Sequence, residues 1–222
     1  MARKHASDNF SIARRLMVKE GLIAKGISDT RVLEVMGLVP RHVFVDEALW
    51  AEAYGDHALP IGFGQTISQP YIVARICELL KLSGSEKVLE VGLGSGYHGA
   101  ILSNLARSVF AIERIPELGD KAKQRLESLG IKNVVVRIGD GSAGWKSFAP
   151  FDRIVVSAAV AEIPPPLTSQ LGDPGRMVLP VGTQEEQWIV LIEKRGDRLH
   201  RTDIERVRFV PLVSRSGRSA AR

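Results

Sequence analysis

The chain has 222 residues, of which 45% are apolar and 25% are charged, and its formal net charge is +5. This balance excludes a disordered or collagen-like protein, and the length suits one domain of ordinary size. No apolar run approaches the roughly 18 residues needed to cross a bilayer, so we expect no membrane partner. We also expect no signal peptide, and the single cysteine, Cys77, favours a reducing compartment, most simply the cytoplasm.

The first part of the chain predicts two helices and an irregular segment. Apolar spacing favours a helix from Asp8 to Ala24, capped by Ser7 or Asp8, and a second from Asp29 to Met36, ended by Gly37. Residues 39–69 are irregular, apolar and rich in glycine, proline and aromatic residues. Such a segment is too long and too apolar to be a simple connecting loop, so we expect it to be packed and to be a candidate for function.

From Ser68 onward the pattern becomes regular. Ser68 is placed to cap a helix entered through Pro70, whose apolar residues continue to Leu80. Buried strands and helices then alternate. The predicted strands are Lys87–Val91, Val109–Ile112, Val134–Val136, Ile154–Ser157 and Met177–Val181, and the predicted helices are centred on Ala100–Leu105 and Pro116–Leu129. Two antiparallel strands, Trp188–Glu193 and Asp203–Phe209, follow. This order predicts an α/β fold, a doubly wound, mostly parallel Rossmann-like sheet with helices on both faces and an antiparallel C-terminal strand pair.

The turn after the first of these strands is the first candidate site. It reads Gly92-Leu93-Gly94-Ser95-Gly96-Tyr97, and glycines at this place let a ligand approach the backbone. The dinucleotide-binding motif would need a glycine where Tyr97 stands. Glu113 ends the next strand, 21 residues after Gly92, where a carboxylate can accept hydrogen bonds from ribose hydroxyls. The alternative is a tight turn with Glu113 on the surface.

Glu90 within the first strand, the glycine turn and Glu113 together resemble the class I S-adenosylmethionine-dependent methyltransferases. The resemblance implies S-adenosyl-L-methionine as cofactor. It also implies that Asp140, after the third strand, accepts a hydrogen bond from the adenine amino group of the cofactor. Without the resemblance, an aspartate at this place would more often be a turn residue. The cofactor-binding residues implied are Gly92, Gly94, Ser95, Gly96, Glu113, Asp140 and Gly141. No metal is expected.

The irregular segment is similar to the protein-L-isoaspartate O-methyltransferase family. The similarity is carried by Val39–Val45, Tyr54–Gly62, Gly64–Tyr71, Val88–Tyr97, Gly139–Gly141, Ile163–Leu167, Gly175–Gly182 and Val207–Val213. It implies transfer of a methyl group to the free carboxylate of L-isoaspartyl residues in damaged proteins, which begins repair through a succinimide. Ser68 would be the catalytic hydroxyl. Substrate would be bound by Ala58, Leu59, Pro60, Ile61, Gln65, Thr66, Leu212 and Val213.

With this resemblance, the chain is expected to be one methyltransferase domain, 1–222. It would consist of an N-terminal helical extension (1–38), an acceptor-site segment (39–80), a cofactor-binding core (81–193), and a C-terminal strand with a basic tail (194–222). We expect a monomer acting on isoaspartyl proteins and peptides.

The sequence departs from the family's pattern at three places. Leu93 replaces a small or hydroxyl residue, His98-Gly99 replaces a glutamine followed by a small residue, and Pro174 stands where a glycine is common. The first two departures lie near the methionine end of the expected cofactor site, so they bear on cofactor affinity rather than on the chemistry.

Two other functions stay open. Residues 194–222 carry nine basic and three acidic residues, a charge of +6. The basic residues alternate with apolar ones, which favours a solvated strand edge and a polar tail. The alternative is a methyltransferase acting on RNA or a small molecule, in which this segment would bind RNA. The segment after the fourth strand, Val156-Ser157-Ala158-Ala159, lacks the base-stacking motif expected of an RNA enzyme, and no nucleic-acid partner is expected. A non-enzymatic binding domain is the second alternative, and for Ser68 a purely capping role remains an alternative.

Overall fold

The computed structural model describes residues 6–213, with side chains from Phe10 onward. The chain divides into two compact units after Glu78, and each is described by itself. No helix within the described residues is long and apolar enough to cross a bilayer.

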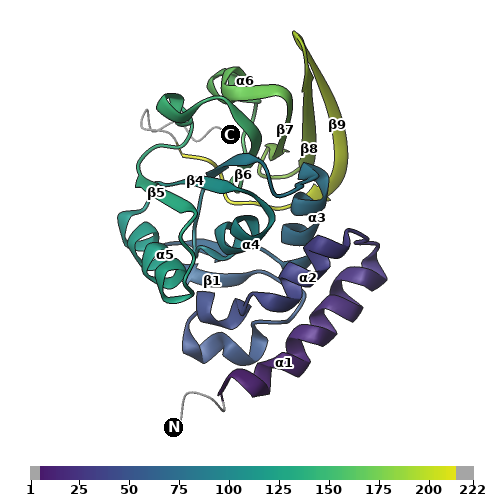
Figure 1. Cartoon of the computed structure of the whole chain (residues 1–222), viewed down its shortest axis with the longest axis vertical. Coiled ribbons are helices and arrows are strands. Elements are labelled where there is room, and N and C mark those ends of the chain that lie inside the picture. The colour runs from purple at the N-terminus through teal and green to yellow at the C-terminus, as the bar shows by residue number, and fades with distance from the viewer. Residues whose placement is uncertain (1–5, 214–222) are drawn as a thin grey trace. The chain divides into compact units, whose positions relative to one another are not determined.

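The first unit begins with the predicted N-terminal helix. Helix α1 (Ala6–Leu16) continues through a π-helical segment (Met17–Leu22) and a 3-10 turn (Ile23–Lys25), drawn in purple in Figure 1. Gly26, at φ +92°, ends it in the left-handed conformation that glycine adopts without strain. Ser7 and Asp8 already lie inside the helix, so the prediction that one of them caps it is wrong.

The second helix is longer than predicted. Helix α2 spans Thr30–Leu38, and the Asp29 side chain accepts hydrogen bonds from the backbone N–H groups of Arg31 and Val32. The predicted end at Gly37 is wrong because the helix passes through this glycine. It ends at Leu38 because the next residue precedes Pro40 and is held in an extended conformation.

Residues 39–69 are packed, as the sequence predicts. They contain two 3-10 helices, Arg41–Phe44 and Glu47–Glu52, and a hairpin of strands β1 (Leu59–Gly62) and β2 (Gln65–Ile67). The His42 ring stacks on Phe10 of α1, with the ring centroids 4.4 Å apart, and its Nδ1 lies 2.8 Å from the Tyr54 hydroxyl. Helix α3 (Pro70–Leu80) follows and leads into the second unit.

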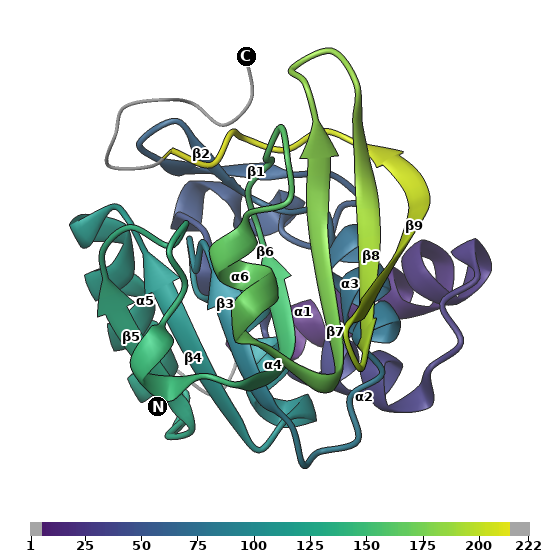
Figure 2. The same cartoon turned by 90° about the horizontal axis from the view of Figure 1, so that it is seen from above.

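The second unit is built on one sheet of seven strands, shown from above in Figure 2. Its strand order is β5-β4-β3-β6-β7-β8-β9, parallel from β5 to β7 and antiparallel from β7 to β9. The strands are β3 (Lys87–Val91), β4 (Ser108–Glu113), β5 (Val134–Ile138), β6 (Phe151–Val156), β7 (Leu171–Gly182), β8 (Gln187–Arg195) and β9 (Arg198–Val207). The predicted fold class is confirmed, including the antiparallel C-terminal pair.

Helices cover both faces of this sheet. Helices α4 (Tyr97–Leu105) and α5 (Pro116–Ser128) connect β3, β4 and β5, and the short helix α6 (Pro165–Gln170) lies on the opposite face, in front of the sheet in Figure 2. The sequence did not predict α6 or the early start of β7 at Leu171. The central strands are buried on both faces, as expected for parallel strands between two helix layers.

The order of the strands fixes where a ligand can bind. From β3 the chain moves outward to β4 and β5, and then returns to place β6 on the other side of β3. The reversal places the topological switch point between β3 and β6, and in such sheets ligands usually bind at the carboxyl ends of the strands beside it.

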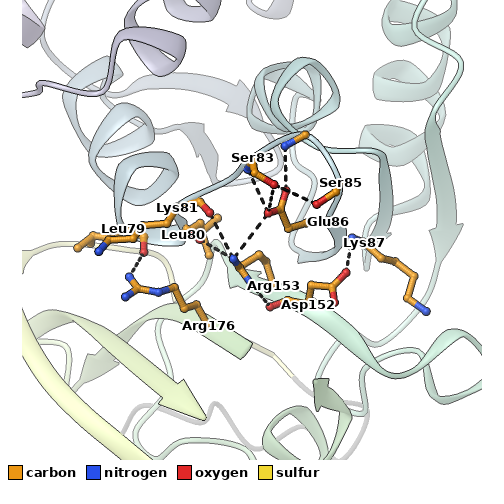
Figure 3. A network of polar contacts seen from close by, with 11 residues as sticks. Leu79, Leu80, Lys81, Ser83, Ser85, Glu86, Lys87, Asp152, Arg153 and Arg176 are labelled. Carbon is orange, nitrogen blue, oxygen red and sulfur yellow. Dashed lines mark hydrogen bonds and ion pairs between the residues drawn. The ribbon is translucent and has the colours of Figure 1, made fainter. Parts of the chain in front are cut away.

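A polar network joins the end of α3 to the sheet (Figure 3). Arg153 of β6 donates hydrogen bonds to the backbone oxygens of Leu80 and Lys81, and Arg176 of β7 donates to that of Leu79. These guanidinium groups satisfy carbonyls that a helix end leaves without partners. Glu86 lies 3.7 Å from Arg153 and accepts hydrogen bonds from the Ser83 side chain and the loop backbone.

We expect Glu86→Gln to destabilise the protein by about 1–3 kcal/mol at pH 7, because the amide cannot accept all of these hydrogen bonds. Burial alone would raise the pKa of Glu86, but the hydrogen bonds from Ser83 and Gly84 bring it below its ordinary value of 4.5. A carboxyl with a lower pKa in the folded state stabilises the fold above its unfolded pKa, and this contribution disappears as the pH falls through the folded pKa.

The measurement is denaturant unfolding from pH 3 to 8, with the exposed Glu127→Gln as control. The difference between wild type and Glu86→Gln should be constant above about pH 5 and shrink below about pH 4. A difference that does not change with pH would contradict this role of Glu86.

Candidate cofactor and acceptor sites

The turn after β3 exposes bare backbone at the carboxyl edge of the sheet. Gly92, Gly94 and Gly96 all have positive φ angles of 90°, 56° and 93°, which other residues adopt only with strain. The Gly92 N–H donates to the Ile112 oxygen at 2.8 Å, and a Cβ atom at Gly96 would lie 3.2 Å from that of Ala122. The glycines therefore serve both the shape of the turn and its packing on α5.

Glu113 at the end of β4 holds this turn in place. One carboxylate oxygen accepts the N–H of Gly94 at 2.8 Å and the other accepts that of Ile115 at 2.9 Å, and the residue is only 6% exposed. A carboxylate has about four acceptor positions. Within residues 6–213 two of these positions accept hydrogen bonds, which leaves about two for ligand hydroxyls.

The Ser95 side chain has a local role. It is buried, and its hydroxyl oxygen accepts the N–H of Tyr97 at 3.3 Å, in the first turn of α4. Arg125 of α5 donates to the Ser95 backbone oxygen at 3.3 Å. Ser95 therefore shapes the turn, and its hydroxyl faces the helix.

Asp140 and Gly141 follow β5 beside Glu113. The Gly139 N–H donates to the Glu113 backbone oxygen at 2.8 Å, and Asp140 Oδ1 accepts both the N–H and the hydroxyl of Ser142. A Cβ atom at Gly141 would lie 2.5 Å from a methyl carbon of Val91. The structure thus brings the residues predicted at the ends of three strands to one edge of the sheet.

Gln170 supports this loop and was missed by the sequence analysis. Its side-chain oxygen accepts the Trp145 N–H at 2.7 Å, and its nitrogen donates to the Ala143 oxygen at 2.8 Å. It is 6% exposed and lies 25 residues from Trp145, outside any motif. No local signal marks such a residue.

Leu93, one of the departures from the family's pattern, is a core residue. It is 3% exposed and packs with Ala111 of β4 and Ala122 of α5. Its side chain fills space between strand and helix. The departure therefore changes packing below the turn and leaves the backbone of the turn bare.

These residues fit S-adenosyl-L-methionine. Glycine backbone at φ +90° lies between β3 and β6, where a Cβ atom at Gly92 would be in ordinary contact with that of Ser157, 3.5 Å away. Glu113 has acceptor capacity for ribose hydroxyls, and Asp140 supplies a second carboxylate at the same edge. Carboxyl groups that accept hydrogen bonds, next to backbone without side chains, suit a nucleoside whose hydroxyl and amino groups donate hydrogen bonds.

The predicted acceptor segment forms the β1–β2 hairpin of the first unit. Leu59 pairs with Ile67, Pro60 with Thr66 and Gly62 with Gln65, and Leu59 and Ile67 are buried. Among the described residues this sheet has only two strands, so each strand keeps an edge without a strand partner. An extended peptide can add to such an edge through its backbone.

Ser68 lies just after β2 and is half-buried. The backbone oxygen of Gln69 accepts the Val73 N–H, so Gln69, and not Ser68, is the cap residue of α3. The predicted capping role of Ser68 is therefore wrong. Within residues 6–213 the structure records no hydrogen bond of the Ser68 hydroxyl, which leaves it available to a ligand.

Leu212 and Val213 belong to the second unit. The N–H of Leu212 donates to the Ala159 oxygen at 2.8 Å, and the Ala159 N–H donates to the Val210 oxygen at 2.8 Å. Ala159 lies just beyond β6, so this segment runs along the carboxyl edge of the sheet. This is the edge that carries the glycine turn.

Comparison with known proteins gives one consistent result. The family model of the protein-L-isoaspartate(D-aspartate) O-methyltransferases matches residues 13–217. The chain is 52% identical to protein-L-isoaspartate O-methyltransferase 1 of Syntrophobacter fumaroxidans over 209 residues, 94% of this chain and 98% of the relative. It is 51% identical to the protein-L-isoaspartate O-methyltransferase of Geobacter metallireducens over 210 residues, 94% and 97% of the two chains.

Solved structures share the fold. One protein-L-isoaspartate O-methyltransferase matches with a TM-score of 0.81 at 29% identity, over 89% of this chain and 65% of that chain. A second, from Plasmodium falciparum, was solved with S-adenosyl-L-homocysteine and matches with a TM-score of 0.76 at 24% identity. It covers 90% of this chain and 97% of that chain.

We expect Glu113→Gln to weaken cofactor binding tens of fold and to lower stability by about 1–3 kcal/mol, because the amide group would face a backbone N–H with its own N–H. Calorimetric titration and thermal unfolding measure the two effects, and Glu127→Gln is again the control. Unchanged affinity in a folded Glu113→Gln protein would remove Glu113 from the cofactor site.

Proposed function

The chain belongs to the protein-L-isoaspartate(D-aspartate) O-methyltransferase family, and we propose that Ser68 and the β1–β2 hairpin bind the acceptor while the Gly92–Gly96 turn, Glu113 and Asp140 bind the methyl donor. The enzyme transfers a methyl group from S-adenosyl-L-methionine to isoaspartyl residues of proteins, the first step of their repair. The observation that carries the assignment of the acceptor residues is the Ser68 hydroxyl, which has no hydrogen bond among residues 6–213 and follows a hairpin that, in the same part of the chain, has only two strands.

The reaction depends more on the relative position of the two substrates than on acid or base catalysis. A carboxyl group with an ordinary pKa near about 4 is already ionised at neutral pH, so it needs no general base. When bound, S-adenosyl-L-methionine supplies an electrophilic methyl group on a positively charged sulfur. The protein's task is to align the carboxylate oxygen with that methyl group and to exclude water.

Ser68 is suited to orient the carboxylate. Its hydroxyl can donate one hydrogen bond to a carboxylate oxygen, and the backbone cap of α3 does not compete for it, because Gln69 fills that position. A hydrogen bond to a charged acceptor is stronger than one between neutral groups. This supports a catalytic role for Ser68.

Backbone recognition can separate isoaspartyl from aspartyl residues. The isoaspartyl main chain is one methylene longer, and its free carboxylate sits on the α-carbon. We assign Ala58–Ile61, Gln65 and Thr66 to the acceptor because the hairpin edge offers backbone hydrogen bonds to an extended peptide. We assign Leu212 and Val213 to it because they follow the carboxyl edge of the sheet.

We further propose that the enzyme acts in the cytoplasm, as a monomer, and without a nucleic-acid partner. Cys77 is the single cysteine of the chain and is buried, which suits a reducing compartment. Charged residues along the edge strand β9 disfavour pairing with another copy.

The same strand argues against an RNA site. Arg201 pairs with Asp203 at 2.7 Å, and Arg206 pairs with Glu186 at 2.9 Å, so two of its cations are already engaged. Arg215, Arg218 and Arg222 of the basic tail lie outside the described residues.

We expect Ser68→Ala to raise the barrier for methylation of an isoaspartyl peptide by about 1.5–3 kcal/mol, which is roughly a 10- to 150-fold loss of turnover. Cofactor affinity should stay nearly unchanged, and Ser68→Thr, which keeps a hydroxyl, should recover part of the turnover. The assay is transfer of a labelled methyl group to an isoaspartyl peptide and to its aspartyl twin. Full turnover by folded Ser68→Ala, or equal methylation of the twins by wild type, would contradict the assignment.

We expect RNA binding to be weak and lost near physiological ionic strength, since binding that depends on phosphate contacts falls steeply with salt. Filter binding across a salt series, with wild type and a chain ending at Val213, measures this. Tight binding at physiological salt that the truncation abolishes would favour an RNA methyltransferase instead.

A further inference from the structure

Two departures from the family's pattern meet at one buried carboxyl group. Glu90 of β3 is fully buried, and within residues 6–213 neither of its carboxyl oxygens has a hydrogen-bond partner. Nδ1 of His98, in the first turn of α4, lies 4.0 Å from Glu90 Oε1. A Cβ atom at Gly99 would lie 2.9 Å from Glu90 Oε2 and 2.9 Å from the Leu93 side chain, so the glycine makes room for both.

The surroundings of the pair favour its uncharged form in the free protein. Burial raises the pKa of Glu90 well above its ordinary value, and the charge of Glu113 raises it further. Burial lowers the pKa of His98 to about 4. These shifts favour the protonated carboxyl group and the neutral imidazole.

Few of the described residues that face Glu90 are titratable. The titratable groups are His98 from α4 and Glu113 from β4, while its register partners on β4 and β6 are Ala111 and Val155. Among residues 6–213 no cation is recorded as acting on this carboxyl, so a bound cation would favour its ionised form.

A buried carboxyl group without a hydrogen bond is costly and calls for a physical explanation. Glu90 lies two residues before Gly92, at the base of the turn assigned to the methyl donor. S-Adenosyl-L-methionine carries a sulfonium charge that S-adenosyl-L-homocysteine lacks. A positive charge bound near Glu90 favours the carboxylate form, and loss of that charge favours the protonated form.

We propose that Glu90 and His98 form a proton-linked sensor of cofactor charge, which releases one proton to solvent when S-adenosyl-L-methionine binds and retains it when S-adenosyl-L-homocysteine binds. The Glu90 carboxyl group loses the proton, and a small shortening of the 4.0 Å separation lets the His98 N–H donate to the carboxylate. This inference rests on the proposed placement of the methyl donor at the glycine turn.

The sensor has a consequence for product release. Because a proton leaves on binding, affinity for the methyl donor rises with pH, by up to about tenfold per unit while Glu90 is protonated in the free protein. Affinity for the demethylated product stays nearly constant. The enzyme therefore prefers donor over product more strongly as the pH rises.

The test is titration calorimetry without acceptor peptide, at one pH near neutrality and in phosphate and Tris, two buffers that differ in heat of protonation. For wild type, the buffer dependence should show about one proton released with S-adenosyl-L-methionine and nearly none with S-adenosyl-L-homocysteine. Glu90→Gln, which resembles the protonated carboxyl in shape, should release none with either ligand. The infrared band of a buried protonated carboxyl should be present in wild type and absent from Glu90→Gln.

His98→Gln restores the family's usual residue and provides a second variant. An amide that donates to Glu90 lowers the pKa of that carboxyl, so proton release at neutral pH should fall clearly below that of wild type. The exposed Glu127→Gln should release protons as wild type does.

Equal release with both ligands, or release that persists in Glu90→Gln, would overturn the sensor. If Glu90→Gln does not fold, wild-type release in His98→Gln would overturn it. Failure of wild type to bind S-adenosyl-L-methionine at all would instead contradict the proposed function.

Discussion

Two backbone N–H groups held by one carboxylate organise the second unit. Glu113 ends β4, and its oxygens accept the N–H of Gly94 in the turn after β3 and that of Ile115 at the start of α5. Its own backbone oxygen accepts the N–H of Gly139 after β5. One residue thus ties together the carboxyl ends of three neighbouring strands, and the cofactor residues depend on this arrangement for their positions.

The chemistry of the family explains why the structure supplies so few catalytic groups. An ionised carboxylate needs no base, so selectivity must come from backbone shape and from charge. The hairpin contributes shape, because its paired strands leave edges that can receive an extended peptide. The glycine turn contributes a bare backbone surface, which its packing against α5 and Ser157 maintains.

Polar side chains of the second unit differ in whether their hydrogen bonds are made, and this difference separates structural from functional groups. Arg153 and Arg176, which bind the end of α3, are half-buried with their hydrogen bonds made, so they stabilise the fold. Glu90 is buried and makes no side-chain hydrogen bond within the part of the chain that the structure describes. We expect the Glu90 carboxyl group to respond to a bound positive charge, because a buried polar group without hydrogen bonds is stabilised strongly by an opposite charge nearby.

The sequence by itself determined the features that depend on neighbouring residues. The strands of the sheet follow from short apolar runs, and the glycine turn follows from residues that adopt positive φ. The fold class and the expected place of the cofactor could be predicted because parallel strands bury both faces and bind ligands at their carboxyl ends.

Tertiary structure decided what depends on contacts between distant segments. Gln170 supports the loop at Trp145, the cap of α3 is Gln69 and not Ser68, and Leu93 is a core residue. The pairing of Glu90 with His98 has no local signal either, because it depends on how α4 packs on β3. Burial removes water from such groups and sets their partners and their charge, and burial is a property of the assembled fold that no short stretch of sequence contains.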